Sequence, residues 1–147
     1  MARIDWDFPD PNIMRVCVDA SHIDVMQHTN NVVYLQWLEA AAWDHSRQLG
    51  LAEADYERLG YGMVARRHVL DYLQPTFLGE TILLGTWIIW NDRLSTRRAY
   101  QFVRESDGQT VFRGRTHWVC VDIKEGRVRR MPPEFQAEYQ SPLQIEE

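Results

Sequence analysis

The sequence has little cysteine and no long apolar run. Cys17 and Cys120 lie far apart, so they form neither a disulfide framework nor a zinc-ligand spacing, and we expect two half-buried reduced thiols. The longest apolar run, residues 82–90, is interrupted by Gly85 and Thr86 and falls short of the ~18–20 residues of a membrane-spanning helix. The acidic first residues contain no apolar signal-peptide core. These features predict a cytoplasmic protein without a membrane partner.

Signatures of several enzyme classes are missing as well. The chain has no Gly-x-Ser-x-Gly, which excludes the nucleophile elbow of a serine hydrolase, and no glycine-rich phosphate loop. Asp24 and His28 are four residues apart, but no third ligand follows at a metal-binding spacing. We therefore expect no metal and no redox cofactor.

Charge is distributed unevenly along the chain. Residues 1–62 carry a net −6, residues 63–130 a net +5 and the last seventeen residues a net −4, and all but one of the 16 basic residues are arginine. Because acids and bases share one small body, a domain-wide basic face for nucleic acid is not expected. A local cationic patch on the middle segment would suit phosphates, whose oxygens match the planar guanidinium fork.

Length and composition predict a single compact domain. The 147 residues are 45% hydrophobic and 25% charged, as in ordinary globular proteins, and no linker or repeat divides them. A chain of this length buries enough surface to fold without disulfides or a metal. We expect one domain over residues 1–147, with a core at about 12–135 and a loose carboxy-terminal tail at 141–147.

The hydrophobic pattern indicates an α+β fold. A strand is expected at 13–19, and apolar residues at helical spacing predict a long helix at 32–49, begun by a cap at Asn30 or Asn31 and ended by Gly50. Shorter helices are expected at 52–59 and 134–139, and four long strands at 64–73, 81–90, 94–104 and 109–123. The simplest way to bury the long helix is to wrap the sheet around it.

One segment concentrates polar groups at the start of the long helix. Asp24, His28, Asn30 and Asn31 lie within eight residues. A helix start offers free N–H groups and a positive dipole end, which would stabilise a carbonyl oxygen that becomes negative during acyl transfer. A nearby carboxylate can attack an acyl carbon or activate water. Taken alone, the same residues are more typical of helix caps than of a catalytic site.

A family resemblance favours the catalytic interpretation. Asp-x-x-x-His-x-Asn-Asn-x-x-Tyr-Leu-x-Trp-x-Glu, from Asp24 to Glu39, resembles the signature of hotdog-fold thioesterases of the 4-hydroxybenzoyl-CoA thioesterase superfamily. It is most similar to the bacterial long-chain acyl-CoA thioesterases, and its Gln-His-x-Asn-Asn core also resembles plant acyl-ACP thioesterases. The likeness covers about residues 12–135 and includes Trp43-Asp44, Tyr72-Leu73-Gln74-Pro75, Gly79-Glu80, Val119-Cys120-Val121-Asp122 and Met131-Pro132.

The resemblance implies a fold, an activity and residue roles. The fold would be a hotdog, with a five- to six-stranded antiparallel sheet around the central helix. The activity would be hydrolysis of an acyl-CoA, or of an acyl-carrier-protein thioester, without a separate cofactor. Asp24 would be the nucleophile or general base, the backbone N–H of Asn31 would polarise the carbonyl, and His28 and Asn30 would line or brace the loop. The family pairs subunits at the active site, so we expect a homodimer or homotetramer.

Substrate contacts are expected from two sets of residues. Met26 and Tyr34 are candidates to line the acyl tunnel, although Tyr34 is also typical of a packing residue on the helix. Arg93 follows a turn, near the position where relatives present a lysine or arginine to the CoA phosphates. Arg66 and Arg67 form a second candidate cluster.

Two departures and two alternatives remain open. Gln27 stands where many relatives have glycine, and Glu39 is followed by Ala42 where an arginine is common. A hotdog hydratase or dehydratase would carry a segment like Asp-x-Asn-Pro-x-His, which this chain fits poorly. A non-catalytic acyl-CoA-binding hotdog protein would keep the pocket and lose the carboxylate, whereas this chain has Asp24.

Overall fold

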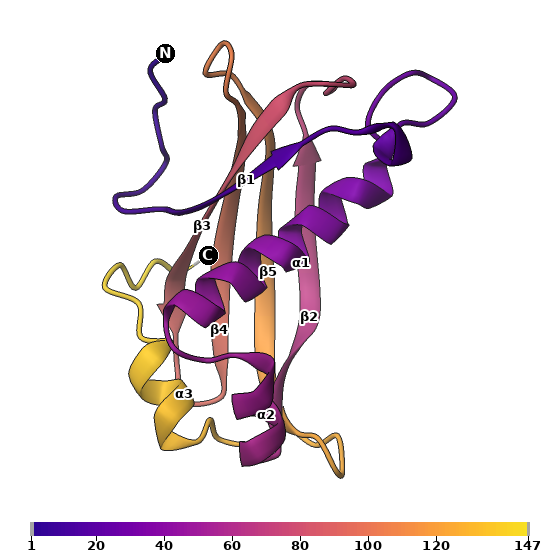
Figure 1. Ribbon diagram of the computed structural model, residues 1–147. Helices are drawn as coiled ribbons and strands as arrows, with labels where there is room; N and C mark the ends of the chain where they lie inside the picture. The colour runs from indigo at the N-terminus through magenta and orange to yellow at the C-terminus, as the bar shows by residue number, and fades with distance from the viewer. Residues whose placement is uncertain (1, 147) are drawn as a thin grey trace. The chain divides into compact units, whose positions relative to one another are not determined.

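The computed structural model describes residues 2–146, and within them five strands form one antiparallel sheet (Figure 1). The order across the sheet is β1-β3-β4-β5-β2. The strands span Asn12–Cys17 (β1), Tyr61–Tyr72 (β2), Thr81–Asn91 (β3), Ser95–Arg104 (β4) and Thr110–Asp122 (β5). Each lies where the alternating pattern predicted it, which confirms the α+β assignment and gives five strands rather than six.

Three α-helices and one short 3-10 helix complete the described part of the chain. They are η1 (Ala20–His22), α1 (Asn31–Gln48), α2 (Glu53–Leu59) and α3 (Pro133–Glu138). Local signals mark the ends of α1 and α2: the side chain of Asn30, one of the two expected caps, accepts a hydrogen bond from the Val32 N–H, and Gly60 ends α2 in the left-handed conformation at φ +77°.

The chain forms two compact units. Of the described residues, the first unit contains 2–44, 70–87 and 100–114, and the second contains 45–69, 88–99 and 115–146. β2, β3, β4 and β5 each contribute residues to both units. The candidate residues around Asp24 belong to the first unit, and the three candidate arginines, Arg66, Arg67 and Arg93, belong to the second.

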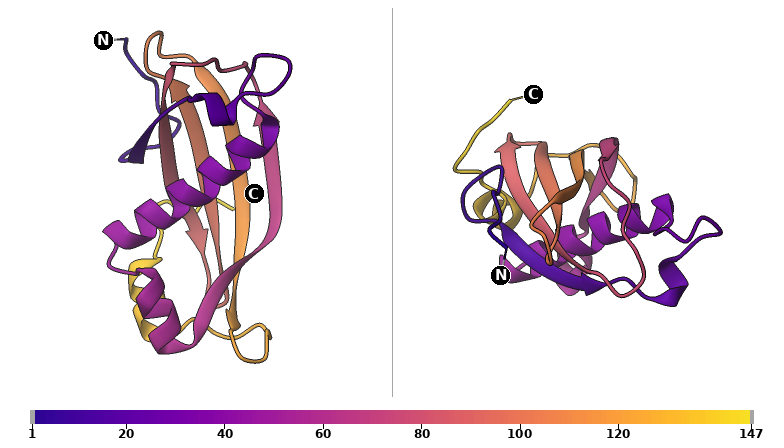
Figure 2. Two further views of the ribbon diagram at one scale, coloured as in Figure 1. Left: turned by 45° about the vertical axis from the view of Figure 1, so that its right-hand side comes forward. Right: turned by 90° about the horizontal axis from the view of Figure 1, so that it is seen from above.

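In the first unit α1 lies across one face of the strands (Figures 1 and 2), and aromatic side chains form part of the core between them. Tyr34 of α1 stacks on Phe112 of β5 at 5.3 Å between ring centroids, and Phe112 stacks on Phe102 of β4 at 4.6 Å. Gly114 lets the helix come close, because a Cβ there would lie 3.3 Å from a methyl group of Leu38. Offset stacked rings of this kind add stabilisation beyond the area that they bury.

The amino-terminal segment packs on β3 within the same unit, which the sequence did not predict. Trp6 and Phe8 contact Trp87 edge to face, and the Trp87 Nε1–H donates to the Pro9 carbonyl at 2.9 Å. Gly85 makes room for the Trp6 ring, since any Cβ at this position would overlap it.

The second unit has its own apolar core with a buried hydroxyl network. Phe135 of α3 is fully buried and packs on Tyr56 of α2. The Ser46 hydroxyl donates to the Leu51 carbonyl and hydrogen-bonds the Tyr139 hydroxyl, each at 2.6 Å. Tyr139 also hydrogen-bonds Tyr56. These bonds satisfy polar groups that would otherwise be costly to bury.

Two expectations were wrong, one about the carboxy-terminal tail and one about the two cysteines. In the tail expected at 141–147, residues 141–145 are hydrogen-bonded to β3 rather than loose. The Ser141 hydroxyl donates to the Ile88 carbonyl and the Ile145 N–H donates to the Ile89 carbonyl, both at 2.6 Å. Residue 147 lies outside the described part. Neither thiol is half-buried: Cys17 is exposed on the alternating strand β1, and Cys120 is fully buried, which raises its pKa to about 11.

A histidine is held neutral inside the second unit. The Nη1 of Arg98, a side chain only 4% exposed, donates to His45 Nδ1 at 2.7 Å. Burial and then the charge of Arg98 lower the pKa of His45 from 6.5 to about 3. The imidazole is therefore the acceptor for a buried guanidinium, and protonating it would place two cations side by side.

This pair predicts acid sensitivity of folding. Between pH 6.5 and about 3 the unfolded chain binds a proton at His45 that the folded chain does not, so stability is present above pH 6.5 and declines as the pH falls. The slope from this group is at most about 1.4 kcal/mol per pH unit. Urea unfolding from pH 7 to pH 4 should show a shallower slope for His45→Asn than for the wild type. An unchanged slope would contradict the assignment.

Candidate functional site

The loop before α1 is closed by its own backbone. Ile23 and Thr29 form an isolated antiparallel bridge, the Asp24 N–H donates to the His28 carbonyl at 3.0 Å, and the Gln27 N–H donates to the Asp24 carbonyl at 3.0 Å. In Figure 2 the segment between η1 and α1 extends beyond the amino-terminal end of the helix. The turn brings Asp24 and His28 to the base of one small loop.

Gln27 adopts a conformation that favours glycine. Its φ is +63°, in the left-handed region that a side chain makes unfavourable. This is the position where many of the proteins that the segment resembles have glycine. The departure therefore leaves the loop backbone in the shape that glycine would adopt freely.

Replacing Gln27 by glycine should stabilise the protein. Relief of the left-handed strain exceeds the added entropy of glycine in the unfolded chain, so we expect a gain of about 0.5–1 kcal/mol in the free energy of unfolding. Urea unfolding measures it, with Gln27→Ala as the control that keeps the strain. A loss of stability in Gln27→Gly would show that the glutamine side chain itself supports the loop.

His28 is braced by an aromatic ring. It contacts Phe77 edge to face at 5.2 Å between centroids, and the ring is half-buried. Its nitrogens have no hydrogen-bond partner among the residues that the structure describes, so either one is available to a water or a substrate. The structure thus gives His28 a fixed position and leaves its polar atoms uncommitted.

Only one oxygen of the Asp24 carboxylate accepts a hydrogen bond from the described residues. Its Oδ1 accepts a hydrogen bond from the Met26 N–H at 2.9 Å, in a turn local to the loop, while Oδ2 has no partner within residues 2–146. The expected placement of this carboxylate over the start of α1 therefore does not appear as a hydrogen bond. The reason is local, since an aspartate two residues before an N–H readily caps its own turn.

One backbone N–H at the start of α1 stands apart from its neighbours. The Thr29 N–H donates to the Thr76 carbonyl, and the Asn30 N–H donates to the His22 carbonyl. The Val32 N–H donates to Oδ1 of Asn30, and the Val33 N–H donates to the Asn30 carbonyl. The N–H of Asn31 has no acceptor in the described part of the chain. It lies at the positive end of an 18-residue helix, where a partial negative charge is stabilised.

A buried hydroxyl group fixes this helix start from the side. The Thr76 hydroxyl hydrogen-bonds Thr29 Oγ1 at 2.6 Å and the Tyr34 hydroxyl at 2.9 Å. The Tyr72 hydroxyl donates to the Asn31 carbonyl at 3.2 Å. Sequence reasoning did not single out Thr76. Tyr34 and Tyr72 belong to the resembling motif, and here they position the backbone around Asn31.

The two expected acyl-contact residues have opposite environments. Met26 is 69% exposed at the loop, so in this chain it does not line an enclosed tunnel. Tyr34 is 3% exposed in the core of the first unit, where burial raises the pKa of its hydroxyl. The packing interpretation of Tyr34 is confirmed, while its contact with substrate stays a prediction.

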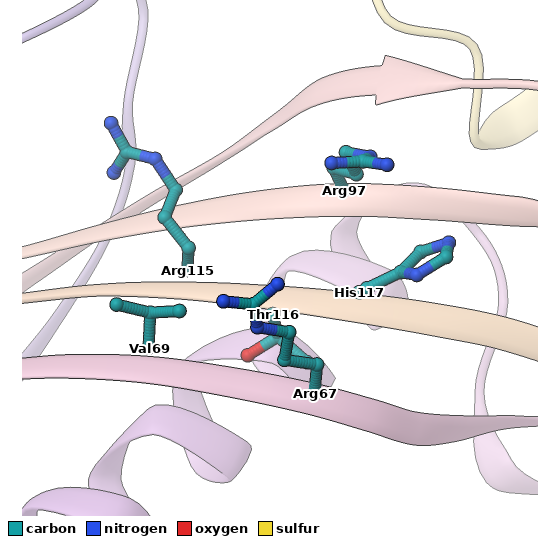
Figure 3. Close-up of a pocket in the computed structure, with 6 residues that line it drawn as sticks. All are labelled: Arg67, Val69, Arg97, Arg115, Thr116 and His117. Atoms are coloured by element: carbon teal, nitrogen blue, oxygen red, sulfur yellow. The ribbon is translucent and has the colours of Figure 1, made fainter. Parts of the chain in front are cut away.

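The expected phosphate-binding arginines do not gather in one place. Arg67 lines a pocket over β2, β4 and β5 in the second unit, whereas Arg66 and Arg93 are exposed and lie outside its lining. The pocket (Figure 3) is lined by Arg67, Val69, Arg97, Arg115, Thr116 and His117. Arg115 and His117 were not among the predicted site residues, although their shared parity along β5 was visible in the sequence.

The environment of the pocket lowers the pKa of His117 below its usual value. Partial burial and the nearby guanidinium groups of Arg97 and Arg66 lower it, against a smaller raising effect of Asp92. The Nδ1 of neighbouring His68 is hydrogen-bonded at 2.8 Å to the hydroxyl of Thr116, which lines the pocket. The pocket is thus cationic through its arginines, with a neutral imidazole beside them.

The described residues offer neither a metal site nor a membrane-spanning helix. Residues 2–146 contain no cluster of three or more histidine, cysteine or acidic side chains placed to hold a metal ion. No helix in that range has the length and apolar character needed to cross a membrane.

Comparisons with known proteins assign the family. The model of the thioesterase-like superfamily matches residues 18–139. The long-chain acyl-CoA thioesterase FadM of Escherichia coli is 27% identical over 114 residues, which cover 75% of this chain and 83% of FadM.

Solved structures share the fold at low sequence identity. The DHNA-CoA thioesterase of Staphylococcus aureus has a TM-score of 0.82 and 23% identity, covering 88% of each chain. A hypothetical S. aureus protein solved in complex with CoA has a TM-score of 0.82 and 17% identity, covering 94% of this chain and 84% of that one. The fold is the hotdog that the motif implied, and the chain belongs to the thioesterase-like superfamily of thioester hydrolases.

Proposed function

We propose that this protein hydrolyses acyl-CoA thioesters to a free acid and CoA. The family supplies the reaction class, and the E. coli relative is named for long-chain acyl-CoA substrates. A second solved relative was crystallised with CoA. Acyl-carrier-protein thioesters remain the alternative source of the same acyl group.

The observation that carries the proposal is the Asn31 N–H. Among the N–H groups of residues 29–33 it alone has no acceptor within residues 2–146, and it lies at the start of α1. A thioester oxygen that accepts this bond would gain negative charge as the carbonyl carbon is attacked. An N–H that is already oriented stabilises this charge without reorganisation at the moment of reaction.

Asp24 is the proposed attacking or activating group. As a general base, it would take a proton from water through the free Oδ2 as the water oxygen bonds to the acyl carbon. The tetrahedral intermediate would then expel the CoA thiolate, which takes up a proton. As a nucleophile, Asp24 would bond to the acyl carbon and expel the CoA thiolate, which takes up a proton, and water would then hydrolyse the resulting mixed anhydride to the free acid and the Asp24 carboxylate. His28 would position the loop or a water, and Asn30 would keep the helix start in place through its cap.

The substrate would extend from this loop. Met26 is proposed to contact the acyl chain together with Tyr34, and Arg93, Arg66 and Arg67 are the proposed contacts of the nucleotide phosphates. No cofactor is needed, because CoA is part of the substrate. We propose a homodimer or homotetramer, in which a neighbouring subunit completes the acyl site at the exposed Met26.

The test is release of CoA thiol from a panel of thioesters. The panel spans acetyl, hexanoyl, lauroyl, palmitoyl, oleoyl, benzoyl and phenylacetyl CoA, with a thiol-trapping reagent as the readout. We expect saturable turnover of at least one chain-length class. Binding of acyl-CoA without any turnover would contradict hydrolysis and favour a non-catalytic acyl-CoA-binding protein.

The two roles of Asp24 are separable by isotope. A single turnover in ¹⁸O-water labels only the released acid if Asp24 is a general base. A nucleophilic route, in which water attacks the anhydride at the aspartyl carbon, leaves ¹⁸O in the Asp24 carboxyl group, which mass spectrometry of the loop peptide detects.

A further inference from the structure

The turn between β2 and β3, which carries Thr76, is held by an arginine of β4. Arg104 is buried, and its Nε lies 2.8 Å from Oε2 of Glu80 at the end of the turn. Its Nη2 donates to the Pro75 carbonyl at 2.7 Å. Arg104 therefore contacts the turn directly before Thr76 and again four residues after it.

Glu80 holds the other side of the same turn. Its Oε1 accepts a hydrogen bond from the Phe77 N–H at 2.7 Å, and its backbone N–H donates to the Phe77 carbonyl at 3.0 Å. The two peptide groups that flank Thr76 are thus bonded, one to Arg104 and the other to Glu80. Hydrogen bonds with one ionised partner are stronger than those between neutral groups, so this pair fixes the Thr76 backbone.

Thr76 connects the turn to the start of α1. It is fully buried between two exposed neighbours, and its carbonyl accepts a hydrogen bond from the Thr29 N–H at 2.9 Å. Its hydroxyl hydrogen-bonds Thr29 Oγ1 and the Tyr34 hydroxyl. Thr29 lies two residues before Asn31 and Tyr34 three residues after it, so Thr76 holds the chain on both sides of the Asn31 N–H.

Arg104 distributes its N–H groups over several acceptors. Besides the contacts with Glu80 and Pro75, its Nη1 donates to Asp107 Oδ2 at 2.9 Å and to Gln74 Oε1 at 3.2 Å. A planar guanidinium can hold these acceptors together, whereas the compact ammonium of a lysine cannot reach all of them at once. The arrangement therefore depends on the shape of the arginine as well as on its charge.

We propose that Arg104 and Glu80 are positioning residues, which set the place of the Asn31 N–H through Thr76. The inference rests on the proposed acyl-CoA hydrolysis. An oxyanion donor has to be in place before the charge develops, and a misplacement of about 1 Å in a reacting geometry costs about 10²-fold in rate. The same pair sets the place of His28, because the ring of Phe77 contacts it.

Two pairs of variants of the full chain test the proposal. Arg104→Lys keeps the charge and loses the planar fork. Its matched control is Arg113→Lys, because Arg113 makes a bidentate pair with Asp7 of the amino-terminal segment instead of bonding to the turn. Thr76→Val removes the connecting hydroxyl at nearly constant shape, and Thr76→Ser restores it.

The readouts are steady-state thiol release and amide hydrogen exchange. We expect Arg104→Lys and Thr76→Val to lower kcat by about tenfold while KM stays within about twofold of the wild type. The Thr29 N–H should exchange about tenfold faster in both, the scale of one lost hydrogen bond, while amides in the middle of α1 keep their rates. Arg113→Lys and Thr76→Ser should match the wild type in both measurements.

Glu80→Gln is a second variant in case Arg104→Lys does not fold. It keeps an oxygen for the Phe77 N–H and removes the charge beside Arg104, at a side chain that is partly exposed. Its kcat should fall and its Thr29 exchange should rise in the same direction as in Arg104→Lys, again with little change in KM.

Wild-type kcat and wild-type Thr29 exchange in the folded variants of Arg104, Glu80 and Thr76 would overturn the proposal. An equal fall of kcat in Arg113→Lys, with faster exchange spread evenly over α1, would also overturn it, because the ion pair would then contribute only to folding. Absence of thiol release by the wild type would contradict the proposed function. Faster Thr29 exchange in the variants would then still support the connection through Thr76, and unchanged exchange would overturn it.

Discussion

Replacing Asp24 by asparagine is expected to lower kcat for acyl-CoA hydrolysis by about 10²-fold or more, the range that a general base contributes. The asparagine carbonyl can still accept the hydrogen bond from the Met26 N–H, so the turn that the Asp24 Oδ1 caps is retained. The variant removes the charge and the proton acceptor and keeps the loop. Steady-state thiol release on the best substrate of the panel measures the effect.

Asp19 offers a matched control for this variant. Its Oδ1 accepts a hydrogen bond from the Ser21 N–H at 2.8 Å, the same two-residue turn that Asp24 makes with Met26. Asp19→Asn should therefore keep wild-type kcat. Wild-type activity in Asp24→Asn would remove Asp24 from the reaction, and an equal loss in both variants would point to a structural effect of turn capping.

The second large effect is expected from Asn31→Pro. Proline has no N–H, and the first position of a helix tolerates it because that N–H is not part of the helical ladder. The variant deletes the one N–H of the helix start without an acceptor in the described chain. Loss of one oxyanion donor lowers kcat by about 10²–10³-fold, and we expect a change of that size with KM much less affected.

Asn31→Ala separates the backbone from the side chain. It keeps the N–H and removes the exposed amide side chain, so its kcat should stay near the wild type. Circular dichroism and thermal unfolding should show both variants folded with similar midpoints. A fall in kcat that is equal for alanine and proline would mean that the side chain, not the N–H, serves the reaction.

Much of the fold was predictable because the signals are local. Alternation placed the strands within a few residues, and Asn30 and Gly60 marked helix ends by their side-chain cap and left-handed conformation. The packing of Trp6 on Gly85 was not predictable, since it joins segments about eighty residues apart with no periodic signal. The hydrogen bond from the Ser141 hydroxyl to the Ile88 carbonyl was not predictable either, because a single hydroxyl in the tail gives no periodic signal.

The candidate site was predictable in its residues and less so in its geometry. The motif named Asp24 and Asn31, but only the backbone bonds reveal that the Asn31 N–H has no acceptor in the described chain while its neighbours do. Thr76, which ties the loop to Tyr34, is a small residue in a turn and carries no pattern of its own. Arginines on separate strands give no sequence signal that they share a pocket.

The most direct test of the account is the amide resonance of Asn31 in the ¹⁵N-labelled protein. The titrant is an acyl-CoA analogue in which a methylene group replaces the thioester sulfur. The resulting ketone keeps the carbonyl oxygen and cannot release a thiol. We predict that the Asn31 N–H proton moves downfield more than those of Thr29, Asn30 and Val32, which already have acceptors. Saturable binding of the analogue with the Asn31 resonance unmoved would contradict the account.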